Sequence, residues 1–400
     1  MHIVLLVIYY PPNTSSAAKL MQDLAERFGH LGHRVTVLTA DDTLDRPYAI
    51  EENGPLAICR VRTGRIYGAG SLIFRALREI ALPWTFWRKA GRFLRSLSPD
   101  AFVYYVPSIF FAPLVRRLKK LWGVRTYLIQ RDFFPDWAVE AGVMGKGPHY
   151  WYFKHREKMN YDAADRIAVQ SPANIQYFRQ KYPARNYAVE VLYNWTDDVL
   201  PPRRVPSHRS RLGLDGKVVF FYGGNIGRAQ DFDNILRLAE AMKSEPSAHF
   251  LLVGPGSEVA HVRAEIARRK LGNVTLCDAV PQDEYLAMLQ EFDIGLISLH
   301  PGIKSANVPG KLLGYLQCGM PTLASVNPGN DLAELLTASG AGFVSVNPDD
   351  AAFLRHARAL ARDAELRAQM GARACRLLRE RFHVQIAARQ ILDYFQSAGS

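Results

Sequence analysis

An apolar run followed by a loop and an amphipathic helical pattern is the feature that most constrains how this chain folds. Residues 3–8 are all apolar, which is typical of a strand buried on both faces of a parallel sheet. A helical pattern over Ala17–Leu31 comes next, and a second strand-like run covers residues 34–39. A strand, a helix and a strand in this order predict a parallel βαβ unit.

The same alternation recurs in two series, which predicts an α/β protein with two doubly wound domains. Further strand-like runs cover residues 101–106, 125–129, 166–170, 217–222, 249–253, 274–277, 294–298 and 321–324. The segment Asp197–Ser210, rich in proline and arginine, separates the two series. We therefore expect an N-terminal domain over residues 1–197 and a C-terminal domain over residues 211–382. We expect the last helix, residues 383–397, to cross back onto the first domain.

The charge of the chain is strongly positive and uneven. Its 50 Lys and Arg residues outweigh 38 Asp and Glu residues, and residues 1–200 hold 27 of these basic residues against 18 acidic ones. Such an excess on one half indicates an anionic partner, which is a nucleic acid, a membrane surface or a phosphorylated substrate. No recognised nucleic-acid module accompanies the charge, so we expect no nucleic-acid partner.

Hydropathy and cysteine content predict the cellular compartment of the protein. No apolar run reaches the roughly 18–20 residues that span a bilayer. The N-terminus lacks the basic start of a signal peptide. The four cysteines lie far apart without a CxxC pair, which argues against a disulfide framework or a zinc site. We therefore expect a cytoplasmic protein.

The loops that follow strands are the most informative, because ligands of open parallel sheets bind beyond the carboxyl ends of the strands. One such loop is Gly223–Arg228. Glycines allow the backbone to approach an anion closely, and Arg228 adds a fork of donors. The loop predicts diphosphate binding at a helix N-terminus, with a plain tight turn as the alternative.

A second loop places Lys311 near the start of a helix, after Pro309. A cation is unfavourable at the positive end of the helix dipole, so its position indicates an anion in front of it. A lysine extended into solvent is the alternative. In a third loop, Gly254 is expected to shape the floor of the pocket or to form a structural turn.

Two strand ends of the first half carry candidates for sugar chemistry. Asp132 follows residues 125–129 among aromatic residues, so it is a candidate base or hydroxyl acceptor. Asn194 either donates to a ligand or holds a turn. The segment Arg60–Arg95 has nine basic residues, one acid and six aromatic residues, which suits the boundary of an anionic membrane. Ordinary helices with solvated arginines are the alternative there.

With these loops in view, the sequence resembles the retaining GT-B glycosyltransferases of family 4. Within that family it is similar to the amino-deoxysugar transferases of bacterial O-antigen and capsule assembly, of the L-fucosamine transferase type. The resemblance covers essentially the whole chain. It rests on Tyr10-Pro11-Pro12 with Gly32–Thr39, Asp132–Pro135, Gly224–Gln230, and Val308–Tyr315 with Gly319–Pro321.

The resemblance implies two Rossmann-like domains facing across a cleft, with the donor nucleotide-sugar in the C-terminal domain and the acceptor in the N-terminal one. It implies Asp132, Arg228 and Lys311 as catalytic residues, the two cations binding the diphosphate. The other donor-binding residues would be Gly224, Asn225, Gly227, Gly254, Ser305, Asn307, Val308, Pro309, Gly310 and Glu334. The acceptor would bind to Asp132, Asn13, Thr14, Ser15 and Asn194.

The sequence departs from the family pattern at a pair of glutamates, whose positions here are Ala306 and Gly314. The ribose of the donor then needs another partner, for which Glu334 is the candidate. Asp231-Phe232-Asp233 has the form of a metal-binding DxD motif, but it opens a helix, where the dipole favours acids. We expect no metal and no cofactor, because cations and helix amides can balance the diphosphate.

Taken together, these features predict an enzyme that moves a sugar from a nucleoside diphosphate, expected to be UDP, to a polyprenyl-diphosphate-linked glycan. The sugar would be an N-acetylated amino-deoxyhexose, and the product a bacterial surface polysaccharide. We expect the protein to be peripheral on the inner membrane, bound through residues 60–95. A UDP-sugar epimerase of the same fold and an inactive nucleotide-sugar-binding scaffold are the alternatives.

Overall fold

We describe the protein from a computed structural model, in which the chain forms two compact units. The structure describes residues 1–400 except 65–71, 107, 141, 203–206, 303–307 and 398–400. Unit 1 comprises Met1–Asn194 together with Val384–Ser400, and unit 2 comprises Trp195–His383. The boundary on the C-terminal side therefore assigns the last helix to unit 1.

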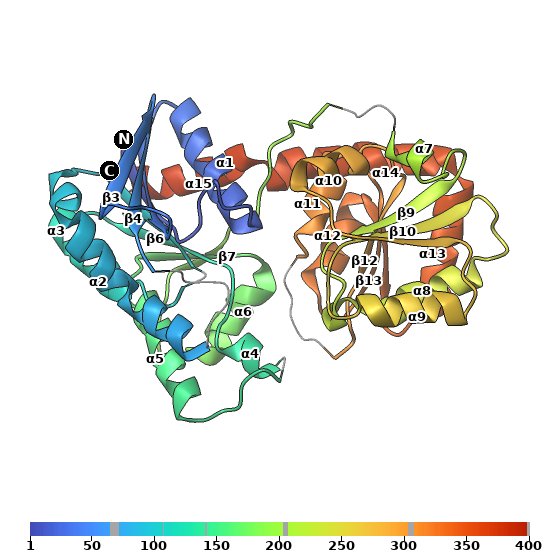
Figure 1. Ribbon diagram of the computed structural model, residues 1–400, viewed down its shortest axis with the longest axis horizontal. Helices are drawn as coiled ribbons and strands as arrows, with labels where there is room; N and C mark the ends of the chain where they lie inside the picture. Colours follow the sequence, from blue (N-terminus) through green and yellow to red (C-terminus); the bar gives the residue numbers. More distant parts are fainter. Residues whose placement is uncertain (65–71, 107, 141, 203–206, 303–307, 398–400) are drawn as a thin grey trace. The chain divides into compact units, whose positions relative to one another are not determined.

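Unit 1 is a twisted sheet covered by helices on its faces (Figure 1). In the described part of unit 1, eight strands follow the order β3-β4-β2-β1-β5-β6-β7-β8, and only the β3–β4 pair is antiparallel. The strands are β1 His2–Leu6, β2 Arg34–Asp41, β3 Tyr48–Asn53, β4 Leu56–Arg62, β5 Ala101–Val106, β6 Thr126–Gln130, β7 Arg166–Val169 and β8 Val189–Val191. The helices are α1 Ser16–His30, α2 Leu72–Ser96, α3 Ala112–Trp122, α4 Asp136–Glu140, α5 Pro148–Tyr161, α6 Pro172–Lys181 and α15 Val384–Gln396.

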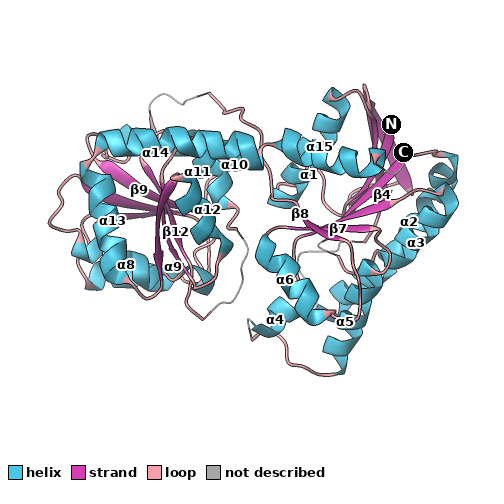
Figure 2. Cartoon of the chain, turned by 180° about the vertical axis from the view of Figure 1, so that it is seen from behind, coloured by secondary structure: helices cyan, strands magenta, loops and turns pink. Residues whose placement is uncertain are grey.

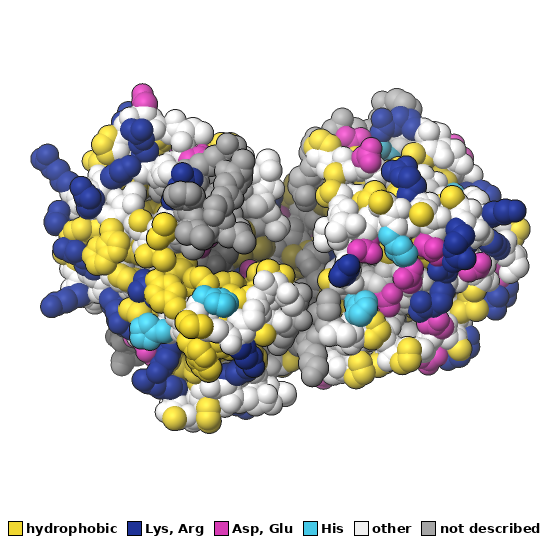
Figure 3. Space-filling model, turned by 60° about the horizontal axis from the view of Figure 1, so that its bottom comes forward, with side chains coloured by type: hydrophobic (Ala, Val, Ile, Leu, Met, Phe, Trp, Pro, Cys, Tyr) yellow, Lys and Arg dark blue, Asp and Glu magenta, His cyan; other side chains and the backbone are white. Residues whose placement is uncertain are grey.

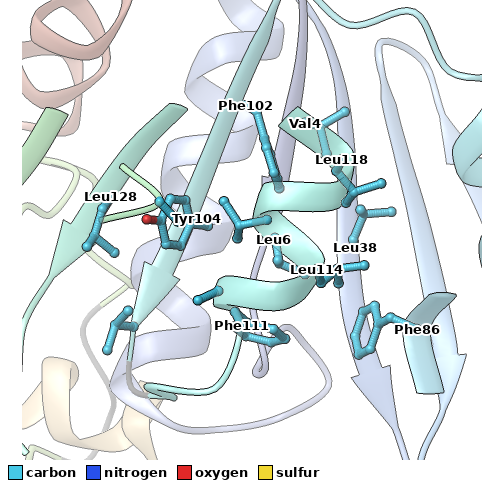
Figure 4. Packing of buried hydrophobic residues seen from close by; sticks show 14 of the residues in the cluster. Val4, Leu6, Leu38, Phe86, Phe102, Tyr104, Phe111, Leu114, Leu118 and Leu128 are labelled. Atoms are coloured by element: carbon cyan, nitrogen blue, oxygen red, sulfur yellow. The ribbon is translucent and has the colours of Figure 1, made fainter. Parts of the chain in front are cut away.

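The core of unit 1 forms where apolar side chains of the central strands meet those of α3. Every residue of β5 is buried, as the continuous apolar run predicts for a strand covered on both faces. Figure 4 shows Leu114 and Leu118 of α3 packed toward Val4, Leu6 and Phe102 of the sheet. The candidate residues of unit 1 lie beyond the carboxyl ends of β1, β6 and β8 of this sheet.

Unit 2 repeats the design with a fully parallel sheet (Figure 2). Its order among the described residues is β11-β10-β9-β12-β13-β14. The strands are β9 Val218–Gly223, β10 Ala248–Val253, β11 Val274–Cys277, β12 Ile294–Ser298, β13 Thr322–Val326 and β14 Gly342–Val346. The helices are α7 His208–Arg211, η1 Arg228–Gln230, α8 Phe232–Ala241, α9 Val259–Arg268, α10 Gln282–Leu289, α11 Lys311–Gln317, α12 Asp331–Ser339, α13 Asp350–Arg362, α14 Ala364–Leu377 and η2 Leu378–Phe382.

The predicted α/β class with two doubly wound domains is confirmed. Sequence analysis missed the β3–β4 hairpin and the edge strand β14, whereas β8 is the strand expected before Asn194. The helix α15 packs against α1, and Arg125 of unit 1 donates from Nε to the Tyr394 hydroxyl over 3.0 Å. Among the described residues, no helix combines the length and the apolar character that crossing a membrane requires.

Candidate functional site

In unit 2, two glycine-containing loops pack backbone to backbone at the carboxyl ends of β9 and β10. The amide of Gly224 donates to the carbonyl of Val253 over 3.0 Å, and Ile226 donates to Pro255 over 2.7 Å. Gly254 has φ +147°, and a Cβ there would lie 1.9 Å from the carbonyl oxygen of Gly224. Only glycine fits this contact, so the paired loops present main chain rather than side chains.

Lys311 is the first residue of α11, and its side chain lies over the glycine loop. A Cβ on Gly224 would be 3.7 Å from Cε of Lys311. The Lys311 ammonium donates to Oε1 of Gln230 over 2.7 Å and lies 4.7 Å from the ring centroid of Tyr222. Burial lowers the pKa of Lys311 to about 8.

No carboxylate of the described residues forms an ion pair with Lys311, and residues 303–307, which lie next to it in the sequence, contain no acid. A cation at the start of a helix is disfavoured by the dipole, and burial adds a desolvation cost. Neutral partners such as Gln230 offset only part of that cost. The arrangement is therefore suited to an anion that approaches the helix start.

Arg228 belongs to the same short η1 turn as Gln230, the partner of Lys311. Its side chain is 91% exposed, and its guanidinium lies 3.6 Å from the carboxylate of Glu258. The preceding turn is held from below, since the Tyr222 hydroxyl donates to the carbonyl of Asn225 over 2.7 Å. Arg228 is thus a solvent-exposed cation on a fixed turn, with Glu258 as its ion-pair partner.

The DxD-like sequence has structural roles, as its position at a helix start predicts. Asp231 caps α8 by accepting from the amide of Asn234 over 3.3 Å. Asp233 lies 3.0 Å from Nε2 of His261. Among the described residues, one group has side chains of the types that bind metals close together. It consists of Asp197, Asp198 and His383, whose possible ligand atoms lie within 4.8 Å of one another. None of these three residues belongs to the predicted donor site.

The remaining donor candidates lie around the start of α11 or on α12. Val308, Pro309 and Gly310 directly precede α11, while Ser305 and Asn307, like Ala306, lie outside the described residues. A Cβ on Gly314 would lie 2.8 Å from Leu289, so the position of the missing glutamate is closed by α10. Glu334 is exposed in the first turn of α12.

In unit 1, Asp132 follows β6 on a backbone that side chains hold from beneath. Gln130 donates from Nε2 to the Asp132 carbonyl over 2.5 Å, and Gln170 donates to the Arg131 carbonyl over 2.9 Å. Asn194 donates to Oε1 of Gln170 over 3.4 Å, so this predicted acceptor residue supports the loop in the structure. Sequence analysis did not identify the two glutamines.

The charges of this loop perturb each other. Arg131 is buried, and burial lowers the pKa of its guanidinium to about 10. Asp132 is exposed at the sheet edge, yet the surrounding protein desolvates its carboxyl and raises its pKa, while Arg131 acts in the opposite direction. A carboxyl in this setting can accept a hydroxyl proton or a hydrogen bond.

A buried ionic and tyrosine network anchors the chain just after Asp132. Asp136, the first residue of α4, accepts from Lys154 over 2.8 Å and from the Tyr150 hydroxyl over 2.7 Å. Lys154 also binds Glu157, which accepts from Tyr161 over 2.7 Å. No sequence motif marks these residues, because they are dispersed over α4 and α5.

The predicted residues of the β1 loop have local roles. Oδ1 of Asn13 accepts from the amide of Ser15 over 3.0 Å. Oγ of Ser15 caps α1 by accepting from the amide of Ala18 over 3.3 Å. Thr14 is exposed. These contacts shape the loop, and the exposed Asn13 and Thr14 side chains can still reach a ligand.

The segment Arg60–Arg95 is not one surface. Phe86 is fully buried, and Trp87 is covered by Arg117, whose guanidinium lies 3.7 Å from the ring centroid. Arg60 is buried and paired with Glu51 over 2.7 Å. Trp84 is 56% exposed. Of the aromatic residues named here, Trp84 alone can contact a partner surface directly.

Comparison with known proteins gives matches over both units. Residues 17–195 match the family described as "Glycosyl transferase 4-like domain", and residues 205–376 match "Glycosyl transferases group 1". The chain is 26% identical over 371 residues to the putative colanic acid biosynthesis glycosyl transferase WcaI of Escherichia coli K12, covering 87% of this chain and 89% of WcaI.

Solved structures share the fold at low sequence identity. Sucrose-phosphate synthase of Thermosynechococcus elongatus has a TM-score of 0.75 at 15% identity, with full coverage of both chains. HepE of Anabaena, in complex with UDP and glucose, has a TM-score of 0.68 at 15% identity, covering 99% of this chain and 100% of HepE. The two family matches cover both units, and the solved glycosyltransferase structures share the fold. The chain therefore belongs to the glycosyltransferases of the GT-B fold.

Proposed function

We propose that this glycosyltransferase moves an N-acetylated amino-deoxyhexose from a UDP-sugar to a polyprenyl-diphosphate-linked glycan during the synthesis of a bacterial surface polysaccharide. The observation that carries the proposal is Lys311, a partly buried cation without a carboxylate partner among the described residues. Two comparisons support it, because WcaI is named for colanic acid biosynthesis and the HepE complex holds UDP.

The diphosphate of the donor would supply the missing anion. It would bind between Lys311 and the exposed guanidinium of Arg228, against the glycine backbone at Gly224 and Gly254. A diphosphate at this position also meets the amides at the start of α11, so the helix dipole favours it. The same contact would offset the desolvation cost and the unfavourable helix dipole that act on Lys311 in the free protein.

The two cations would act on the leaving group. As the bond between sugar and diphosphate breaks, negative charge develops on the diphosphate, and preorganised cations stabilise it most at that stage. An oxygen of the departing phosphate would take the proton of the acceptor hydroxyl on the same face of the sugar, which retains the anomeric configuration. Asp132 would orient the acceptor through its carboxylate. No metal is required in this scheme.

The lipid part of the acceptor calls for contact with a membrane, and we assign it to a surface formed by α4, α5 and the loop between them, called the aromatic surface for its three exposed rings. Figure 3 shows hydrophobic side chains on this face of unit 1, with Lys and Arg side chains at its margins. The surface consists of Trp137, Val143, Trp151 and Tyr152, which are 48%, 72%, 65% and 41% exposed. Residues 137–156 contain one acid, Glu140, against the basic residues Lys146, Lys154 and Arg156.

This composition suits an anionic lipid interface, where aromatic rings enter the headgroup layer and basic residues attract the lipid charge. Trp84 of α2 adds a further exposed ring. The aromatic surface thus extends the predicted contact through residues 60–95, in which the described rings of Phe86, Trp87 and Phe93 pack against the core.

The test is UDP release from UDP-N-acetylated hexosamines and their deoxy forms, with and without a polyprenyl-diphosphate-linked N-acetylhexosamine in detergent. We expect acceptor-dependent release and a product whose anomeric configuration matches the donor, as read by NMR. Conversion of one UDP-sugar into another without acceptor would identify an epimerase. Binding of UDP without turnover of any donor would identify an inactive scaffold.

A further inference from the structure

Unit 1 contains a cavity of ≈ 310 Å³ at the carboxyl ends of β1 and β2. Its lining residues come from the β1 loop, the end of β2 and the strand β4, and they are Ile8, Tyr9, Tyr10, Pro12, Asn13, Ala40, Asp41, Asp42, Thr43, Arg60 and Thr63. Ligands of open parallel sheets bind at this edge. The cavity is separate from Asp132, which lies at the end of β6.

The charge of the lining is opposite to that of the surrounding chain. Asp41 and Asp42 contribute two carboxylates, and Arg60 is the cation of the described lining. Arg60 is already neutralised, because its Nε lies 2.7 Å from the Glu51 carboxylate and a second nitrogen donates to the carbonyl of Pro11 over 2.6 Å. The first half of the chain is basic overall, yet this cavity presents uncompensated negative charge.

The Asp41 carboxylate is held in place by the turn that follows it. Oδ1 of Asp41 accepts from the amide of Thr43 over 2.8 Å and from its hydroxyl over 2.7 Å, which fixes the turn that carries Asp42. The Asp42 side chain is exposed at the rim. A carboxylate fixed at the rim of a cavity is a strong acceptor for hydroxyl donors.

Tyr10 is a buried residue of the cavity lining. Its side chain is only 5% exposed, and its hydroxyl has no hydrogen-bond partner among the described residues. An unpaired buried hydroxyl costs free energy, so such groups are found where a ligand or water completes them. Ile8, Tyr9 and Tyr10 add apolar residues to the lining beside the polar groups.

We infer that this cavity binds an uncharged sugar ring of the acceptor and discriminates against a ring that carries a carboxylate or a phosphate. The inference rests on the proposed transfer to a glycan. Hydroxyls of a neutral ring donate to Asp42 and Asp41, and its apolar face lies against the tyrosines. Among the described lining residues, an anionic ring meets two carboxylates and no cation other than the paired Arg60, so like-charge repulsion opposes its binding.

The test compares methyl glycosides of glucose, galactose and mannose with the corresponding methyl uronates, which differ by one carboxylate. Affinities are measured by ligand-observed NMR at pH 7. We expect at least one neutral glycoside to bind, and its uronate to bind about tenfold more weakly. Asp42→Asn should weaken the neutral glycoside, and Asp42→Lys should remove or reverse the discrimination against the uronate.

Asp45→Asn is the matched control, since Asp45 is an exposed acid of the same loop that does not line the cavity. Thermal unfolding of each variant shows that it is folded. Equal binding of neutral and anionic rings, absence of binding by any neutral glycoside, or an effect of Asp45→Asn equal to that of Asp42→Asn would overturn the inference.

Titration of UDP into the same proteins separates this inference from the proposed function. Failure of UDP to bind, with glycoside binding that depends on Asp42, would reject the UDP donor and leave the cavity assignment intact. UDP binding that depends on Lys311, with glycoside discrimination that is insensitive to Asp42, would reject the cavity assignment alone.

Discussion

The candidate residues of the two units are held in place by different means. In unit 2, Lys311 lies over loops that are joined by main-chain hydrogen bonds and need glycine at their contact. In unit 1, Asp132 stands on a loop held by side chains, with Gln130 and Gln170 beneath it and Lys154 behind it. A backbone-built site depends on a few glycines, whereas a side-chain-built site depends on many dispersed contacts.

The largest effect is expected from Lys154→Met in unit 1. The Lys154 ammonium binds Asp136 and Glu157, which are 6% and 0% exposed. Its loss leaves Asp136 with the ammonium of Lys181 at 3.7 Å and leaves Glu157 without an ion-pair partner among the described residues. Removing one partner of a buried ion pair costs about 3–5 kcal/mol of unfolding free energy. Thermal and denaturant unfolding measure this loss.

Lys158→Met is the matched control on the same helix, with an expected change within about 0.5 kcal/mol. If unit 1 is organised by side chains independently of unit 2, UDP binding of the folded Lys154→Met protein stays at the wild-type level. A loss of UDP binding in the folded variant would break the comparison, because it would couple the network to the donor site.

The next largest effect is expected from Lys311→Met. The variant keeps the length of the side chain and removes the charge that stabilises the leaving diphosphate. Removal of one preorganised electrostatic group lowers turnover by roughly 100- to 1,000-fold. UDP release in the presence of acceptor measures turnover, and calorimetry measures UDP affinity. Lys243→Met, an exposed lysine of unit 2, is the control and should leave both unchanged.

Gly254→Ala tests the backbone contact in unit 2. The new Cβ would collide with the Gly224 carbonyl, and φ +147° is strained for any residue with a Cβ. We expect a loss of roughly 1–3 kcal/mol in unfolding free energy, together with weaker UDP binding. Gly272→Ala is the control, because its Cβ would meet open space. Equal stability of the two variants would show that the loops can separate without cost.

The same difference explains how much could be predicted from the sequence. Gly223–Arg228 and Lys311 were predicted as a site because glycines after a strand and a cation at a helix start are local signals. Gln130 and Gln170 were missed, since they lie forty positions apart and meet only when β6 pairs with β7. The cavity at the ends of β1 and β2 was also missed, because its lining residues come together only when β2 pairs with β1 and β4.

The predicted membrane segment, residues 60–95, shows that composition alone does not tell which side chains are exposed. The composition of Arg60–Arg95 does not indicate that Phe86 faces the core or that Arg117 covers Trp87. The aromatic surface of α4 and α5 escaped notice because its aromatic residues are mixed along α5 with buried ones such as Tyr150 and Tyr161. Composition identifies the residue types of a surface, but the helix orientation decides which are exposed.

A smaller effect is expected from pH, acting on unit 2 alone. The pKa of Lys311 is about 8, below the usual value for a lysine, so the ammonium loses its proton as pH rises through 8. UDP requires the charged form, and its affinity should fall by up to about tenfold per pH unit above pH 8, until the higher pKa of the complex is reached. Lys311→Arg stays charged and should abolish this dependence. The same slope in Lys311→Arg would assign the titration to another group.

The smallest effect is expected at the aromatic surface of unit 1. This prediction tests whether the exposed side chains of unit 1 bind a membrane. Trp151→Ala with Tyr152→Ala removes two exposed rings and leaves the buried side chains of α5 in the sequence. We expect affinity for vesicles of anionic phospholipid to fall by about tenfold, as burial of one aromatic ring would supply. Co-sedimentation measures it, with Val346→Ala, an exposed apolar residue of unit 2, as the control. Vesicle binding that this pair of changes leaves untouched would move the lipid contact to Trp84 and the basic residues of α2, because these remain as the exposed aromatic and cationic groups of the predicted segment.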